Sequence, residues 1–489
     1  MNDPLATTAV GYCVDADDPA IAVITMRHAP VNSLGHALRD GVARALARAQ
    51  ADPRVRAVVL TGNGRAFSAG ADVTEFGTPL QRAEPALPTL LALIEDSAKP
   101  VVAAIDGLAL GGGLELALVC HARVARGSAR VGLPEITLGL IPGAGGTQRL
   151  PRLAGIDTAL AMVLGGQPQK AAALAASGLF DEVVTDEAVA GAGEVTAKPT
   201  ADAAPDATPD ALLAAARRVA QALLQRGPPW PRAQDRALDA AALAAAISAQ
   251  RDRLTPRQRL QPAHAAALDA VAAAALPIDA GLQRERDLFL ALVPTTAAKA
   301  LRYQFKAERE AAKLPPALQA QAAADLPRID SVAVIGAGTM GTGIAICALD
   351  AGLQVLLLEQ DEAALQRGAA RIPEHYAQRV AAGKLDAARA AANQQRLLAT
   401  TDWAALAQAD LVIEAVFEEL AVKREVFARI DAIARPGALL ASNTSYLDID
   451  AIAAATTRPQ DVLGLHFFSP AQVMKLLEVV RGAASSPRA

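Results

Sequence analysis

The sequence predicts an α/β protein in which two α/β regions flank a mainly helical one. Strand-like apolar runs alternate with helix-like segments over the first 185 residues, and the same alternation returns at Ser331. Between these regions, residues 211–313 are rich in strong helix formers and are interrupted at prolines. This alternation is typical of α/β architecture. A chain of 489 residues has room for roughly three domains.

The composition excludes several classes of function. Hydrophobic residues make up 52% and charged residues 20% of the chain, and no apolar run is long enough to predict a membrane span. The formal net charge is −4 without a long basic cluster, which argues against nucleic acid as a partner. The start of the sequence does not resemble a secretory signal, and Cys13, Cys120 and Cys347 fit reduced thiols. We expect a cytoplasmic protein without a metal site.

Three strand-like runs and one helix characterise the first region. The strands are predicted at residues 20–26, 55–62 and 101–106, and the helix at residues 36–50. Residues 188–210 are rich in Ala, Pro, Asp and Thr without periodicity, as in a linker. We therefore place the domains at residues 1–187, 188–328 and 329–489, and the middle one combines the linker with a helical region.

A glycine-rich run from Gly107 to Gly146 contains two carboxylates, Glu115 and Glu135. Residues 111–113 are consecutive glycines that precede a helix-like pattern, so free backbone N–H groups at a helix start can approach an anion closely. Twenty residues apart, the two carboxylates can meet only through the fold. Taken alone, each also fits a structural role, because acidic residues are favoured in a first helical turn.

Residues 10–185 resemble the crotonase superfamily, and enoyl-CoA hydratases in particular. The segments GRAFSAGADVTEF and PGAGGTQRL carry the resemblance together with the glycine-rich run. It implies the crotonase fold, a ββα spiral, and a coenzyme A thioester as substrate. By resemblance, the backbone N–H groups of Ala71 and Gly112 form an oxyanion hole, and Glu115 and Glu135 hold the water that adds to a 2-enoyl-CoA.

The chemistry explains why these groups are needed. A conjugated thioester is attacked at C3 only if negative charge can build up on its oxygen, and losing one preorganised donor costs about 3 to 4 kcal/mol. By resemblance, Glu115 activates the water while Glu135 exchanges the proton at C2. The same exchange would support isomerisation of a 3-enoyl to a 2-enoyl thioester.

A second glycine motif opens the last region. In SVAVIGAGTMG, residues 331–341, the glycines Gly336, Gly338 and Gly341 stand between a strand and a helix. The next apolar run ends at Glu359, where a ribose hydroxyl would need an acceptor. Alone, such a motif fits a tight turn equally well, but strand, turn, helix and acid together predict a Rossmann-type domain that prefers NAD to NADP.

Residues 329–482 resemble the 3-hydroxyacyl-CoA dehydrogenase family through LVIEAVFEELAVK, LLASNTSYLDI and GLHFFSPAQVMKLLEVV. The resemblance implies that His466 is the catalytic base and that Glu478 orients its imidazole, although a histidine beside two phenylalanines is also typical of a core. Further implied contacts to NAD or substrate come from Met340, Val416, Phe417, Glu418, Lys423, Ser445 and Ser469. Ser469 stands where many relatives carry Asn.

Together these regions predict a β-oxidation enzyme that hydrates 2-enoyl-CoA and then oxidises 3-hydroxyacyl-CoA with NAD. The family continues past this segment into a helical domain, whereas the sequence stops at Ala489. We expect from this a truncated chain that binds NAD but dehydrogenates poorly. Two alternatives stay open: an enoyl-CoA isomerase or hydratase with a non-catalytic second half, and a binding subunit that docks a thiolase.

Overall fold

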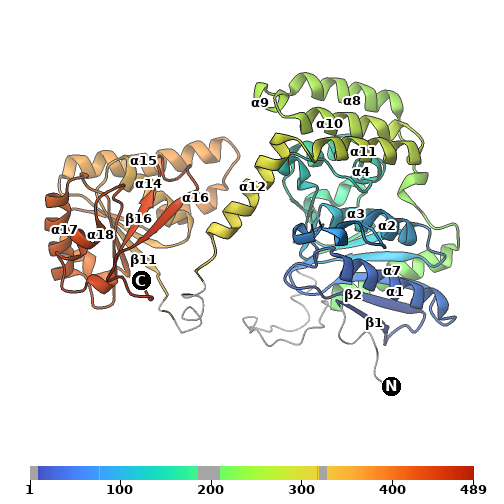
Figure 1. The fold of residues 1–489 in the computed structure, drawn as a ribbon, viewed down its shortest axis with the longest axis horizontal. Helices are drawn as coiled ribbons and strands as arrows, with labels where there is room; N and C mark the ends of the chain where they lie inside the picture. The colour runs from blue at the N-terminus through green and yellow to red at the C-terminus, as the bar shows by residue number, and fades with distance from the viewer. Residues whose placement is uncertain (1–8, 76–77, 186–209, 316–317, 319–325, 327) are drawn as a thin grey trace. The chain divides into compact units, whose positions relative to one another are not determined.

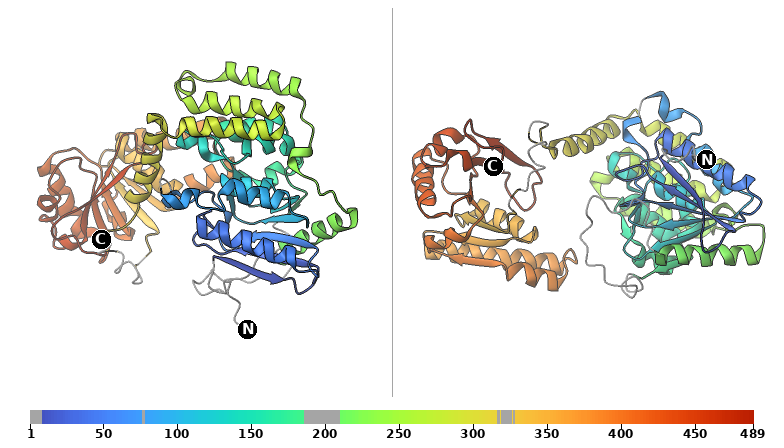
Figure 2. Two further views of the ribbon diagram at one scale, coloured as in Figure 1. Left: turned by 45° about the vertical axis from the view of Figure 1, so that its right-hand side comes forward. Right: turned by 90° about the horizontal axis from the view of Figure 1, so that it is seen from below.

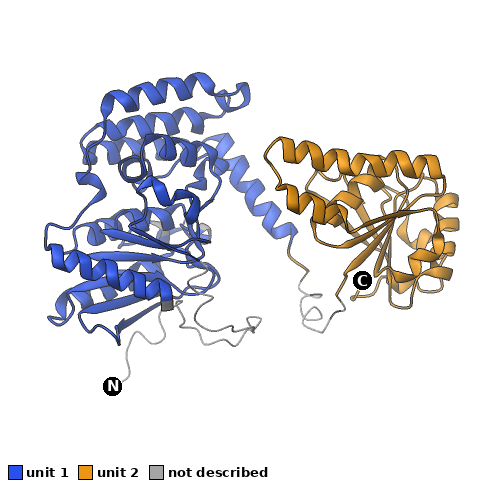
Figure 3. Cartoon of the chain, turned by 180° about the vertical axis from the view of Figure 1, so that it is seen from behind, with its two compact units in different colours: residues 1–312 blue, residues 313–489 orange. Residues whose placement is uncertain are grey.

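The computed structural model describes residues 9–75, 78–185, 210–315, 318, 326 and 328–489. The chain divides into two compact units, residues 1–312 and 313–489 (Figure 3). The linker predicted over residues 188–210 lies, apart from Asp210, outside the described residues. Among the described residues, no helix combines the length and apolar character that a membrane crossing requires.

Unit 1 contains a six-stranded sheet and a smaller four-stranded sheet, whose strands alternate along the chain with those of the large sheet. The large sheet pairs β1 with β2 antiparallel and its other neighbours parallel. In sheet order its strands are β1 (Val10–Val14), β2 (Ile21–Met26), β3 (Ala57–Gly62), β5 (Val101–Ile105), β7 (Ala122–Arg126) and β10 (Glu182–Val184). The small sheet contains β4 (Ala66–Ser68), β6 (Leu108–Leu110), β8 (Arg130–Gly132) and β9 (Gln169–Lys170). The three predicted strands are thus confirmed as β2, β3 and β5.

Helices cover both faces of the large sheet, which explains why β3 and β5 are buried along their whole length. One face packs in the main core, and the other packs against α7. The elements that follow the strands are α1 (His36–Ala51), η1 (Val73–Glu75), η2 (Pro79–Arg82), α2 (Leu87–Glu95), α3 (Gly112–Leu118), η3 (Pro134–Leu138), α4 (Gly146–Ala154), α5 (Ile156–Gly165) and η4 (Ala171–Ser177). The predicted helix at residues 36–50 is confirmed as α1.

The helical region belongs to unit 1: α7 packs on the large sheet, whereas α8, α10 and α11 form a layer over α4 and α5 (Figures 1 and 2). Its breaks follow the prolines, since α7 ends before Gly227-Pro228-Pro229 and α11 begins after Pro277. Its elements are α7 (Asp210–Arg226), η5 (Ala233–Asp235), α8 (Ala240–Arg253), α9 (Pro256–Arg259), α10 (Pro262–Ala272), η6 (Ala273–Ala275), α11 (Ile278–Leu292) and α12 (Thr296–Ala311).

Unit 2 is a doubly wound α/β unit. Its sheet order is β13 (Leu397–Thr400), β12 (Gln354–Leu358), β11 (Ser331–Ile335), β14 (Leu411–Glu414), β15 (Leu439–Ser442), β16 (Val462–Phe467) and β17 (Leu477–Arg481). All neighbours are parallel except β16 and β17. The remaining elements are α14 (Thr339–Asp350), α15 (Glu362–Ala381), α16 (Ala387–Gln394), η7 (Trp403–Gln408), α17 (Leu420–Ile433), α18 (Ile449–Ala453) and η8 (Pro459–Asp461). Strand order reverses beside β11, the position where open α/β sheets bind ligands.

Candidate active sites

Glu115 lies in the first turn of α3 and is 3% exposed. Its Oε1 accepts hydrogen bonds from the backbone N–H groups of Ala144, at 2.8 Å, and Gly146, at 2.9 Å. Burial raises the pKa of Glu115, and these two donors oppose that rise. The loop before α4 therefore fixes one oxygen of the carboxylate.

Glu135 reaches the same place from η3. A Cβ on Gly111, the N-cap of α3, would lie 2.9 Å from Glu135 Oε1, and Gly111 has a φ of +52°. Glycine is therefore needed there twice over, for the conformation and for the space. Burial, followed by the charges of Glu115 and Glu285, holds the pKa of Glu135 well above its ordinary range. Its Oε2 is buried and has no hydrogen-bond partner among the described residues.

The fold thus brings the two predicted carboxylates together. The helix α3 begins at Gly112, slightly earlier than the apolar pattern predicts, so Gly111 and not Gly113 is its last non-helical residue. This shift places the N-terminus of α3 directly beside Glu135.

The backbone of Ala71 lies next to that of Gly112. A Cβ on Gly112 would lie 3.7 Å from the Ala71 nitrogen, and a Cβ on Gly70 would lie 3.2 Å from the Gly112 nitrogen. Gly70 has a φ of +94°, and its N–H donates to Ser68 Oγ over 3.2 Å. The two backbone N–H groups assigned by resemblance to an oxyanion hole are therefore neighbours in the structure.

A third buried carboxylate, Glu285 of α11, was missed by sequence reasoning. Its oxygens accept from the N–H groups of Gly145, at 2.6 Å, and Thr147, at 2.9 Å, and from the Thr147 hydroxyl. Burial, and then the charge of Glu115, raises the pKa of Glu285 to about 8. The helical spacing of Gly281, Glu285 and Leu292, which share the buried face of α11, could have indicated that Glu285 is buried.

In unit 2, the turn between β11 and α14 requires its glycines. A Cβ on Gly341 would lie 1.8 Å from the Gly336 carbonyl oxygen, and Gly336 has a φ of +102°. The position that a Cβ would take on Gly338, the N-cap of α14, is open: apart from neighbouring backbone, no atom of the described residues lies within 4 Å of it. An open helix N-terminus of this kind suits a phosphate group. Met340 lies in the first turn of that helix.

Glu359 directly follows β12 and turns back to this loop. Its Oε2 accepts from the N–H of Ala337 at 2.9 Å, and its Oε1 accepts from the N–H of Gln360 at 2.7 Å. The predicted acidic residue therefore lies at the edge of the glycine turn, where a ribose would be bound.

A buried ion pair supports the neighbouring loop after β14. Lys423 is 1% exposed, and its Nζ lies 2.7 Å from Glu414 Oε1 and 3.1 Å from Glu418 Oε2. Burial alone would raise the pKa of Glu418, but hydrogen bonds from Thr444, Ser445 and Lys423 lower it. Sequence reasoning found Glu418, Lys423 and Ser445 but missed Glu414, which closes an apolar strand.

The other predicted cofactor contacts lie on loops at the same end of the sheet. The N–H of Val416 donates to Glu414 Oε1 over 2.8 Å, whereas the side chain of Phe417 is 84% exposed. A Cβ on Gly336 would lie 3.6 Å from the Val416 nitrogen, so this loop contacts the glycine turn. Ser469 is exposed between β16 and β17.

His466 and Glu478 face each other across antiparallel strands. Their Cα atoms are register partners of β16 and β17, and His466 Nδ1 lies 2.7 Å from Glu478 Oε2. The N–H of Phe467 donates to Asn443 Oδ1 over 2.9 Å, which ties β16 to the end of β15. Asn443 was not among the predicted site residues.

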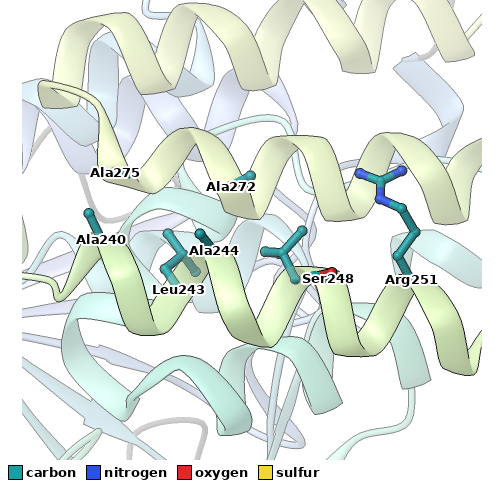
Figure 4. A pocket seen from close by; sticks show the side chains of 8 residues that line it. Ala240, Leu243, Ala244, Ser248, Arg251, Ala272 and Ala275 are labelled. Atoms are coloured by element: carbon teal, nitrogen blue, oxygen red, sulfur yellow. The ribbon is translucent and has the colours of Figure 1, made fainter.

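A pocket of about 300 Å³ lies elsewhere in unit 1, between α8 and α10 (Figure 4). Its lining is apolar apart from Ser248 and Arg251, and Arg251 pairs with Asp269 at 2.7 Å. The lining residues are Ala240, Leu243, Ala244, Ile247, Ser248, Arg251, Ala272 and Ala275. None of the predicted site residues lines this pocket.

Known proteins resemble the chain over nearly its whole length. The peroxisomal bifunctional enzymes of Danio rerio and Homo sapiens are 41% and 38% identical to it, over 96% of this chain and 61% of each relative. The peroxisomal fatty acid beta-oxidation multifunctional protein AIM1 of Arabidopsis thaliana is 34% identical, over 98% of this chain and 64% of its own length. The chain therefore spans less than two thirds of these relatives.

Two family models account for most of the chain. Residues 17–228 match the model for enoyl-CoA hydratase/isomerase, and residues 331–489 match the model for the 3-hydroxyacyl-CoA dehydrogenase NAD binding domain. Both resemblances predicted from the sequence are confirmed. The chain thus joins a domain of the enoyl-CoA hydratase/isomerase family to the NAD-binding domain of the 3-hydroxyacyl-CoA dehydrogenase family.

Proposed function

We propose that unit 1 adds water to 2-enoyl-CoA thioesters and that unit 2 oxidises the resulting 3-hydroxyacyl-CoA with NAD. The observation that carries the first step is the meeting of Glu115 and Glu135 beside the backbone N–H groups of Ala71 and Gly112. Two neighbouring carboxylates next to paired donors match the needs of addition to a conjugated thioester.

The paired N–H groups would stabilise the thioester oxygen as negative charge develops on it. The Gly112 donor stands at the N-terminus of α3, so the helix dipole adds to its effect. An oxyanion donor of this kind typically contributes about 3 to 4 kcal/mol to catalysis.

The carboxylates would divide the proton transfers between them. Glu115 accepts a proton from water as the water oxygen bonds to C3, and Glu135 gives its proton to C2 as the double bond electrons move there. Return of a proton from Glu115 to Glu135 restores the starting state. The raised pKa of Glu135 supports its role as the proton donor. Proton exchange at C2 also supports 3-enoyl to 2-enoyl isomerisation as an additional activity.

In unit 2, bound NAD supplies the acceptor for the hydride that leaves C3. The open N-terminus of α14 at Gly338 fits a phosphate, and the Glu359 carboxylate fits a ribose hydroxyl. We assign the proton of the 3-hydroxyl group to His466, whose imidazole Glu478 orients and stabilises when charged. Met340, Val416, Phe417, Glu418, Lys423, Ser445 and Ser469 are proposed to line the nucleotide and substrate.

Several broader assignments belong to this proposal. The division into residues 1–187, 188–328 and 329–489 remains our proposed domain organisation. The cytoplasm is our proposed compartment, supported by Cys13, Cys120 and Cys347, which are not joined in disulfides; the relatives above are named as peroxisomal. A thiolase subunit is the proposed partner, because it would consume the 3-ketoacyl-CoA product.

One set of assays tests the proposal. The purified chain is expected to hydrate crotonyl-CoA, and the loss of absorbance of the conjugated thioester measures the rate. NADH formation from 3-hydroxybutyryl-CoA and isomerisation of a 3-enoyl-CoA are measured beside it. Isomerisation without hydration would favour the isomerase alternative, and binding of acyl-CoA or NAD without any turnover would favour a docking subunit.

A further inference from the structure

The buried carboxylate of Glu285 contacts the loop that holds Glu115, and the proposed mechanism does not use it. We propose that Glu285 is a positioning residue of the hydration site, which fixes from α11 the loop that holds Glu115. This inference rests on the proposed function, and it extends the site into a helix beyond residues 17–228, the range that matches the hydratase model.

Four successive backbone N–H groups are divided between two carboxylates. Those of Ala144 and Gly146 donate to Glu115, and those of Gly145 and Thr147 donate to Glu285. Gly145 has a φ of +104°, a conformation that glycine adopts without strain. Because the donors alternate along one turn, a shift of either carboxylate moves the N–H groups that bind the other.

The contacts behind Glu285 are also buried and close. Glu285 is 1% exposed, and the Thr147 hydroxyl that it binds also accepts from Gln148 Nε2 at 2.8 Å. The same Nε2 donates to the Ala270 carbonyl of α10 over 2.8 Å. A Cβ on Gly281 would lie 2.3 Å from Gln148 Oε1, so glycine at this position allows α11 to approach α4. The side chain of Glu285 and the close approach at Gly281 therefore hold α11 against the loop and α4, and Gln148 joins the same loop to α10.

The charge of Glu285 also reaches the reacting groups. Its charge raises the pKa of Glu135, and the charge of Glu115 raises that of Glu285. The elements packed against α11 are α4, α10 and η6. These elements carry four titratable groups. Arg149 pairs with Glu95, and Asp269 pairs with Arg251. Arg152 donates to backbone carbonyls, and burial lowers the pKa of His264.

Glu285→Gln tests the role with a readout that loosening alone would not change. We expect kcat for crotonyl-CoA hydration to fall about tenfold to a hundredfold with a smaller change in KM, because Glu115 loses its fixed position. Removing the charge also lowers the pKa of Glu135, so the alkaline limb of the pH profile moves to lower pH. Glu285→Asp keeps the charge, and its alkaline limb stays in place.

The matched control is Asp287→Asn, which removes a carboxylate from the exposed face of the same helix. It should leave kcat and the pH profile unchanged. If Glu285→Gln does not fold, Thr147→Val takes its place, since it removes the hydroxyl that binds Glu285 and Gln148 but keeps the backbone N–H that binds Glu285, and it should lower kcat severalfold. A folded Glu285→Gln, or in its absence Thr147→Val, with the kcat and pH profile of the control would overturn the inference.

A second measurement does not depend on turnover. Amide hydrogen exchange at residues 143–148 should be faster in Glu285→Gln than in Asp287→Asn, because the N–H groups around Glu115 lose their anchor. Equal exchange in the two variants would contradict a positioning role. A wild-type chain that does not hydrate enoyl thioesters would refute the proposed function, whereas the exchange result would still decide the role of Glu285.

Discussion

The two candidate sites place their carboxylates in opposite environments. In unit 1, Glu115 is 3% exposed, and the loop before α4 binds it through backbone donors. In unit 2, the side chains of His466 and Glu478 are 15% and 50% exposed, and strand register alone pairs them. Burial raises the pKa of the carboxyl groups in the first site, while strand register orients a single imidazole in the second.

The largest effect is expected from Glu135→Gln. Without its proton donor at C2, hydration of crotonyl-CoA should fall about a thousandfold, while NAD binding stays unchanged. Asp157→Asn, an exposed substitution on α5, serves as the control in the same absorbance assay. Near-native turnover of Glu135→Gln would refute the assignment of this residue.

A comparably large effect is expected in the other unit from Lys423→Met. Glu414 would then be a buried charge without its partner, which costs about 3 to 5 kcal/mol. Chemical denaturation should show unit 2 destabilised, while crotonyl-CoA hydration persists. The double variant Lys423→Met/Glu414→Gln should recover much of the loss, since no unpaired charge remains. Equal loss in the single and double variants would show that the pairing does not matter.

A smaller effect is expected from Glu478→Gln. The imidazolium of His466 would lose its charged partner, so NAD-dependent oxidation of 3-hydroxybutyryl-CoA should fall about a hundredfold with little change in NAD affinity. Glu425→Gln, exposed on α17, is the matched control. Initial rates of NADH formation provide the measurement, and equal rates in both variants would remove Glu478 from the site.

The smallest effects, when taken per pH unit, concern the pH dependence of stability, which should differ in sign between the units. Folding raises the pKa of Glu285 from 4.5 to about 8, so its contribution is present at acid pH and is lost as pH rises through that interval. Folding lowers the pKa of Glu418, so its contribution is lost as pH falls through its ordinary value and below. Each linked proton changes the free energy of unfolding by about 1.4 kcal/mol per pH unit at most.

Denaturation followed separately for each unit checks these signs. The pKa shift of Glu285 spans roughly pH 5 to pH 8. Over this interval, the free energy of unfolding of unit 1 should decline less steeply in the Glu285→Gln variant than in the wild type. Unit 2 should show no matching decline over that interval. The same slope in the variant and the wild type would contradict the linkage.

The sequence predicts the local parts of both sites well. The glycine turn and Glu359 follow from a strand, turn and helix that a short pattern encodes. The pairing of His466 with Glu478 was implied by the family resemblance, and the register of β16 and β17 brings the two residues together. The strands β2, β3 and β5 follow from their apolar runs for the same reason.

The residues that sequence reasoning missed depend on distant or concealed contacts. Glu285 binds a loop 140 residues before it, and no spacing rule links the two segments. Glu414 lies only nine residues from Lys423, but it ends a buried strand. From the sequence alone, an acidic residue at a strand end is interpreted as exposed to solvent, and only the structure shows its contact with Lys423. Glu115 and Glu135 could be recognised as candidates, whereas their meeting required the fold.

A double-mutant cycle on Glu115 and Glu135 tests the central claim most directly. The hydration rates of Glu115→Gln, Glu135→Gln and the double variant are compared with that of the wild-type chain. If both carboxylates act on one thioester, the double variant should be little slower than the slower single one, because groups that act as a unit are strongly non-additive. Losses that multiply, or a single variant with near-native rate, would contradict a shared site.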